Sequence, residues 1–184
     1  TTEKMETQDL FPEDFIVALP TPSNYIGPNR IFAKDGEYHD QLVYIKDAGR
    51  EEEDGFPFYF KHKKEWAGEL PDSLTDAVYA FYIVNAIRDL RGDYKAHRSM
   101  LINISRFVAV QKHIKAEVEE IHGNAYRAIK FNLSADEQSL KDPVLYRIHE
   151  IWSKYYSHIE FSWEEIAEAM YQAIEKIQIK VVNS

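Results

Sequence analysis

The stretch RSMLINISRF, residues 98–107, constrains the fold more than any other part of the sequence. Five of its residues are large and apolar, the run ends at Ser105-Arg106, and a helical pattern, VAVQKHIKAEVEEI, follows at once. A short apolar run that leads directly into a helix is typical of a buried strand opening a parallel α/β sheet. No glycine-rich phosphate loop stands near it. The sequence therefore predicts the start of a nucleotide-type sheet without the part that holds the nucleotide.

The clearest helical pattern covers LPDSLTDAVYAFYIVNAIRDLRGD, residues 70–93. Asp72 or Ser73 is expected to cap its first turn, and Gly92 is expected to end it in the left-handed conformation. The residues from Tyr79 to Ile87 are apolar nearly all round. This pattern predicts a helix that is buried on more than one side.

Three more helical patterns and a second strand follow. The last helix opens with the sequence pattern of a capping box, Ser162 followed by Glu165. The alternating apolar residues of IQIKVVNS predict a strand over Ile177–Val182, parallel to a central strand over Met100–Ile104, with the helices as the crossover. The three helices are expected over Val108–Ile121, with a continuation to Ile129, over Pro143–Tyr156 and over Trp163–Ile177.

Residues 1–69 are expected to form an irregular N-terminal segment, and residues 70–184 a helix-rich α/β core. Short strand-like runs occur at Phe15–Leu19 and Tyr38–Ile45, but the prolines at 12, 20, 22 and 28 restrict regular structure there to short pieces. The first residue is not methionine, and the last predicted strand ends with the chain. Both ends are therefore interpreted as cuts through a longer polypeptide.

Composition places the chain among folded, soluble proteins. Its 184 residues suffice for one domain with a core, and 45% of them are hydrophobic. The formal net charge of −9 disfavours broad contact with nucleic acid or anionic membrane, so any nucleic-acid contact must come from a local basic patch. Cysteine is absent, which excludes disulfides and thiolate metal sites, and no run has the length of a membrane span. We expect a cytoplasmic protein without a membrane partner.

Few residue patterns point to catalysis. Asp93-Tyr94-Lys95 has the acid-x-Lys order of magnesium nucleases, but it follows a helix-ending glycine and is expected in a loop. His113 and Glu117 could share a helix face as metal ligands, although a solvent-facing pair is the simpler interpretation. The tryptophans at 66, 152 and 163 could stack on bases or pack in the core. The residues alone predict neither a catalytic residue nor a metal site.

Three stretches resemble the Z1 domain, a family of bacterial proteins labelled as endonucleases. They are NYIG at 24–27, LPDSLTDAVYAFYIVNAIRDLRG at 70–92 and RSMLINISRF at 98–107, in this order and at these distances. The resemblance covers most of the chain, and the second and third stretches are its most specific parts. The family favours histidine where Asn103 stands, a departure that bears on local contacts.

The resemblance implies both a fold and a function. Full-length members resemble superfamily II helicase-like ATPases of restriction or defence gene clusters, and this chain would then be a partial RecA-like second lobe that starts at Met100–Ile104. ATP and Mg²⁺ are expected for the full-length protein, with no cofactor in this chain, and the expected partners are DNA and a MutL-like ATPase. A metal-dependent endonuclease domain and a helical protein-interaction module are the alternatives.

Ser105 and Arg106 are the predicted nucleic-acid contacts. They follow the carboxyl end of the predicted strand, where ligands of open α/β sheets gather, and they precede the helix that starts near Val108. A hydroxyl, a guanidinium and a helix N-terminus together suit a phosphate group. In the alternative interpretation, Ser105 only caps the helix and Arg106 forms a surface ion pair.

Overall fold

The computed structural model of the chain describes residues 26–131 and 139–182. The chain divides into two compact units, residues 1–44 and residues 45–184. The described part of the first unit contains a short helix α2 (Pro28–Phe32) and a 3₁₀ turn η2 (His39–Gln41).

One strand-like run predicted from the sequence is not a strand in the structure. The run at Tyr38–Ile45 begins with the η2 turn, and its remaining residues are not in a strand, so this prediction is wrong. The guanidinium of Arg30 forms an ion pair with Glu37 and donates to the hydroxyl of Tyr38 at 3.1 Å, which holds the turn against α2. The run at Phe15–Leu19 lies outside the described residues.

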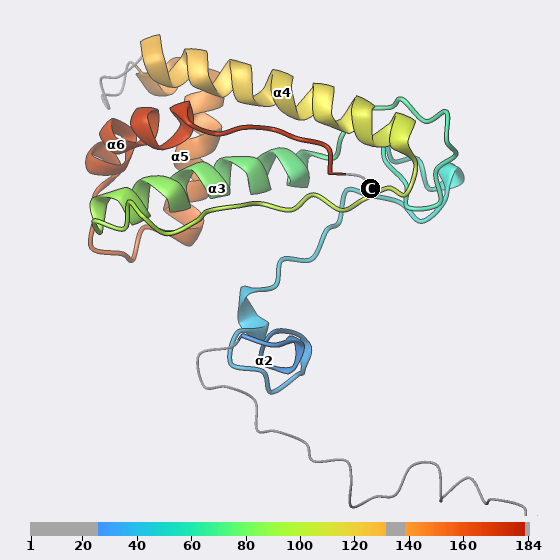
Figure 1. Ribbon diagram of the computed structural model, residues 1–184, viewed down its shortest axis with the longest axis horizontal. Helices are drawn as coiled ribbons and strands as arrows, with labels where there is room; N and C mark the ends of the chain where they lie inside the picture. Colours follow the sequence, from blue (N-terminus) through green and yellow to red (C-terminus); the bar gives the residue numbers. More distant parts are fainter. Residues whose placement is uncertain (1–25, 132–138, 183–184) are drawn as a thin grey trace, which may run out of the picture. The chain divides into compact units, whose positions relative to one another are not determined.

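The second unit is built from helices (Figure 1). One long extended segment lies between α3 and α4, and another follows α6. Helix α3 contacts α5 and α6, and α4 packs on the same two helices. Figure 1 shows that α3 and α4 run in the same direction, and that the extended chain between them runs back along α3. The elements are η3 (Glu52–Asp54), α3 (Asp72–Leu90), α4 (Val108–Phe131), η4 (Ser139–Lys141), α5 (Pro143–Tyr155) and α6 (Trp163–Glu175).

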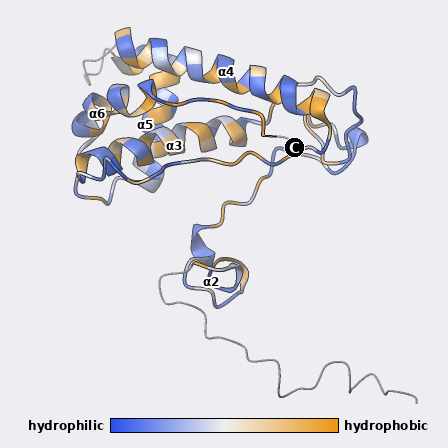
Figure 2. Cartoon of the chain, viewed as in Figure 1, coloured by the Kyte–Doolittle hydropathy of each residue, from blue (hydrophilic) through white to orange (hydrophobic). Residues whose placement is uncertain are grey.

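Helix α3 is the centre of the core, as its sequence predicts. Tyr82, Ile83 and Ala86 are at most 2% exposed, and they belong to buried rows on more than one side of the helix. Helix α4 instead alternates hydrophobic and hydrophilic residues along its length (Figure 2), because only one of its faces meets the core. The apolar faces of α5 and α6 complete the core, with Ile148, Ile151, Ile166, Met170 and Ile174 among the buried residues.

The start of α3 differs from the prediction. Neither Asp72 nor Ser73 caps the helix, since the N-cap position belongs to Pro71. The carboxylate of Asp47 accepts a hydrogen bond from the backbone N–H of Ser73 at 2.7 Å and so replaces the local cap. The hydrogen bonds from Ser73 help to lower the pKa of Asp47 despite its partial burial. At the other end, Gly92 has φ 77°, which confirms the predicted left-handed end.

Local signals define where α5 and α6 begin. Asp142 caps α5 by accepting hydrogen bonds from the backbone N–H of Val144 at 2.8 Å and of Leu145 at 3.2 Å. The predicted capping box of α6 is confirmed: the Ser162 hydroxyl accepts from Glu165 N–H, and the Glu165 carboxylate accepts from Ser162 N–H.

The predicted α/β fold with a partial RecA-like second lobe is wrong. Within the described ranges the chain is helical and no β-strand is formed; the residues over Met100–Ile104 and Ile177–Val182 are extended but belong to no sheet. The one bridge recorded in those ranges joins Gly49 and Tyr59, outside both predicted strands.

The apolar residues of these two segments misled the prediction because they report burial and not pairing. Met100, Ile102 and Ile104 do pack against the core, while Leu101 is 85% exposed, so the side chains alternate as they would in a strand. Ile177 and Ile179 pack in the same way. A half-buried extended segment on a helical core therefore gives the same sequence pattern as a half-buried strand.

Candidate nucleic-acid interface

Ser105 and Arg106 lie in the turn between the extended segment and α4, as the sequence predicts. The Ser105 hydroxyl accepts a hydrogen bond from the backbone N–H of Phe107 at 3.0 Å, and the Ser105 carbonyl accepts one from the side-chain amide of Gln111 at 2.7 Å. These two bonds join the turn to the first turns of α4. The backbone that carries Arg106 is thereby fixed at both sides.

His62 holds the same turn from inside the protein. Its Nε2 lies 2.9 Å from the Ser105 hydroxyl, and its Nδ1 lies 2.9 Å from the carbonyl oxygen of Tyr59. Because a carbonyl can only accept, Nδ1 carries a proton, and in the neutral ring Nε2 accepts from the Ser105 hydroxyl. The hydroxyl of Ser105 therefore donates to His62 and accepts from the backbone at the same time.

Aromatic rings surround His62 and fix its position. The imidazole is 7% exposed, and its centroid lies 5.4 Å from the ring of Phe58, 5.8 Å from that of Trp66 and 6.0 Å from that of Phe107. Phe58 is itself 1% exposed. This cluster joins residues 58–66 to the start of α4, so the site depends on two parts of the chain that lie far apart in sequence.

Arg106 differs from Ser105 because its side chain is exposed. Its guanidinium carbon lies 5.0 Å from the centroid of the neighbouring Phe107 ring. Among the ion pairs of the described residues, none involves Arg106. A guanidinium in this position can present its N–H groups to an anion in solution.

The stretch of sequence that contains this turn has only basic charged residues, whereas the chain as a whole is acidic. No Asp or Glu occurs between Asp93 and Glu117, although the formal net charge is −9. The first turn of α4 contains no acidic residue, and Lys112 is exposed one turn after it. The sequence prediction named Ser105 and Arg106 but included neither this acid-free stretch nor His62. The stretch is visible in the sequence, whereas the contact with His62 spans 43 residues and has no local signal.

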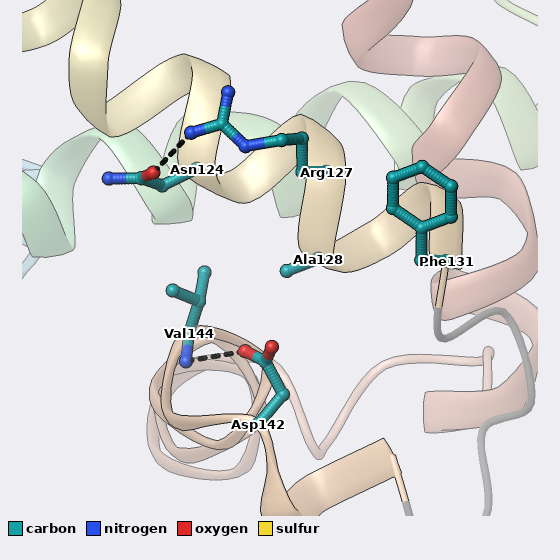
Figure 3. Close-up of a pocket in the computed structure, with 6 residues that line it drawn as sticks. All are labelled: Asn124, Arg127, Ala128, Phe131, Asp142 and Val144. Atoms are coloured by element: carbon teal, nitrogen blue, oxygen red, sulfur yellow. Dashed lines mark hydrogen bonds between the residues drawn. The ribbon is translucent and has the colours of Figure 1, made fainter.

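A shallow pocket of about 310 Å³ lies at the other end of α4 (Figure 3). Arg127 donates to the side-chain oxygen of Asn124 at 2.6 Å, and Asp142 is occupied with the N-terminus of α5. Figure 3 shows these two polar pairs on opposite sides of the pocket. The pocket is lined by Asn124, Arg127, Ala128, Phe131, Asp142 and Val144 and contains none of the predicted site residues.

The residues that the sequence offered as weaker catalytic or metal-binding candidates form contacts within the protein. Asp93 accepts from Arg88 at 2.8 Å, and this bond lowers the pKa of the Asp93 carboxyl. His113 Nε2 lies 2.8 Å from the carbonyl oxygen of Gly68, and its Nδ1 lies 4.0 Å from Glu117. In the described ranges, no group of three or more His, Asp or Glu residues could hold a metal ion.

The tryptophans take part in packing. Trp66 donates its indole N–H to the carbonyl of Pro57 at 3.2 Å and contacts the ring of His113. The rings of Trp152 and Trp163 contact each other in a tilted arrangement with 5.9 Å between centroids, and Trp163 is buried in the core. These contacts assign all three indoles to packing between elements.

Comparison with known families identifies the chain. The Z1 domain family matches residues 73–184, which is more than half of the chain and includes the whole Ser105–Arg106 turn. The chain therefore belongs to the Z1 domain family, which confirms the resemblance seen in its sequence. Comparisons with curated proteins and with solved structures found no match. None of the helices in the described ranges combines the length and apolar character that crossing a membrane requires.

Proposed function

We propose that this Z1 domain binds the phosphate backbone of a nucleic acid through the turn before α4. Arg106 is the contact residue, and the exposed Lys112 adds a second positive charge one turn further on. Ser105 has a positioning role in this proposal, because its hydroxyl is already bonded to His62 and to the Phe107 N–H. The contact itself is made by the guanidinium and by backbone N–H groups at the exposed start of α4, at Val108 and Ala109.

One observation carries this proposal. Arg106 is an exposed arginine in an acid-free stretch of a protein whose net charge is −9, and its turn is fixed by the buried His62. A polyanion is repelled by most of this surface, so only a local patch of this kind can attract it. The rigid turn also lowers the entropy lost when the side chain is ordered by a phosphate.

The wider role follows from the family resemblance and is part of the proposal. The domain would act within a helicase-like, DNA-acting protein of a bacterial restriction or defence system, in the cytoplasm. ATP and Mg²⁺ would be bound elsewhere in that longer polypeptide, and a MutL-like ATPase would be its partner. We assign a binding role to this chain and no catalytic step.

The test is a binding measurement on Arg106→Ala. The affinity of the chain for a fluorescein-labelled 20-mer DNA is measured by anisotropy at several salt concentrations. Loss of one phosphate contact should weaken binding and reduce the slope of log K against log salt by about one. Lys112→Ala should reduce the slope by a similar amount.

The matched control is Arg127→Ala, which removes an exposed arginine from the opposite end of the same helix. Its affinity and salt slope should equal those of the unchanged chain. Equal affinities and slopes for the chain and for Arg106→Ala would overturn the assignment of this turn. Metal-dependent nicking of plasmid DNA by the chain would instead favour the endonuclease alternative.

A further inference from the structure

The extended segment that precedes the Ser105–Arg106 turn has a backbone without partners. Within the described ranges, residues 99–104 take part in no backbone–backbone hydrogen bond. The segment is nevertheless packed, because Met100, Ile102 and Ile104 rest against the helical core. Packing on one side has removed part of its surface from water without giving its N–H and C=O groups partners in the chain.

Arg98, the residue just before the segment, is held by side-chain bonds. Arg98 donates to the carbonyl oxygen of Asn85 at 3.0 Å and to the carboxylate of Asp89 at 2.6 Å, and its own side chain is only 15% exposed. At the other end, Ser105 is held by His62 and α4. The chain between these two anchors is thus kept extended, as a strand would be before its neighbour is added.

An extended backbone of this kind is a template for another strand. Its N–H and C=O groups alternate between two edges, and an extended peptide can pair with one of those edges at every second residue. Leu101 is 85% exposed on the outward face and would gain an apolar cross-strand neighbour. Nucleic acid offers no matching row of alternating donors and acceptors.

Charge indicates what the added strand should contain. Lys95 and His97 are exposed just before the segment, and no acidic residue lies between Asp93 and Glu117. A partner strand with carboxylates at its ends and β-branched residues in its middle is complementary to this edge. A second copy of the same basic segment would place like charges together, which disfavours pairing between copies of the chain.

We propose that residues 99–104 are a docking edge for an extended, acidic-ended segment of another protein, which adds to it as a β-strand. This interaction goes beyond the proposed nucleic-acid contact, because it uses the backbone of the extended segment and leaves Arg106 free. It gives the Z1 domain a polypeptide partner recognised by main-chain pairing, with side chains at alternate positions setting the preference.

The experiment uses a synthetic probe. The ¹⁵N-labelled chain is mixed with millimolar acetyl-Glu-Val-Thr-Val-Thr-Val-Glu-amide, and amide hydrogen exchange is followed residue by residue. The expected result is severalfold slower exchange at every second amide of residues 99–104, because only alternate N–H groups face the added strand. Leu101→Glu, at an exposed position, should lose this protection through repulsion of the acidic peptide.

The control peptide carries two adjacent prolines at its centre, which removes amide donors from both of its edges. It should give no protection. Equal protection by both peptides, or protection without the alternating pattern, would overturn strand addition. Protection that rises with protein concentration in the absence of peptide would show that a second copy is the occupant. Protection given by a 20-mer DNA instead of the peptide would assign the segment to nucleic-acid binding.

Discussion

The hydrogen bond between His62 and Ser105 gives the sharpest test of how the site is held together. His62→Phe keeps an aromatic ring among Phe58, Trp66 and Phe107, so packing changes little. It removes the bonds to the Ser105 hydroxyl and to the Tyr59 carbonyl.

The magnitude follows from these two bonds. Each contributes about 1 kcal/mol to the free energy of unfolding, and the partners left without a bond in a partly buried site add to the loss. We expect His62→Phe to lower the free energy of unfolding by about 2–3 kcal/mol. Ser105→Ala should lower it by about 1–2 kcal/mol, since its hydroxyl bonds both His62 and the Phe107 N–H.

A double-mutant cycle isolates the shared bond. Urea unfolding of the chain, the two single variants and the double variant should give a coupling free energy of about 1 kcal/mol, because the bond can be lost only once. His158→Phe, at an exposed histidine, serves as the control and should leave the urea midpoint unchanged. A coupling below about 0.3 kcal/mol would refute the claim that His62 holds the turn.

Three further predictions test the core and the helix ends. Burial lowers the pKa of His122 below its ordinary value of 6.5, so on acidification the unfolded chain binds this proton before the folded chain does. The stability of the chain should therefore fall as the pH drops below about 6.5. A smaller change of the urea midpoint between pH 7.5 and pH 5 in His122→Gln than in the unchanged chain would confirm it. Ser162→Ala should cost about 1 kcal/mol of unfolding free energy, measured by urea. Gly92→Ala forces a side chain into φ 77° and should cost about 1 kcal/mol, seen as a lower Tm; an unchanged Tm would contradict the strain.

Sequence reasoning succeeded where the signal is local. The start of α5 at a proline, the capping box of α6 and the left-handed end at Gly92 each depend on residues within a few positions of one another. The breadth of the apolar surface on α3 likewise reported its burial on several sides. Such features are determined by short-range geometry, so one sequence suffices to predict them.

Sequence reasoning failed where a contact joins residues that are distant in the sequence. The cap of α3 comes from Asp47, 26 residues before its partner Ser73, and no local pattern indicates this bond. The sheet prediction failed for a related reason, because whether an extended segment becomes a strand depends on a neighbour that the segment itself does not specify. For the site, the turn could be predicted from its position before a helix, but its support by His62 could not.

The support of the turn also determines how the two site residues share their roles. The Ser105 hydroxyl is hydrogen-bonded to both His62 and the Phe107 N–H. It can donate to a phosphate only if its bond to His62 breaks, which would cost about 1 kcal/mol. Arg106 has no such competitor among the ion pairs of the described residues, and its backbone is fixed by the neighbours on each side. Ser105→Ala should therefore weaken nucleic-acid binding through loss of order in the turn, with the salt slope unchanged, whereas Arg106→Ala should change the slope itself. Anisotropy titrations at several salt concentrations separate the two effects, and a reduced slope in Ser105→Ala would show that the hydroxyl contacts phosphate after all.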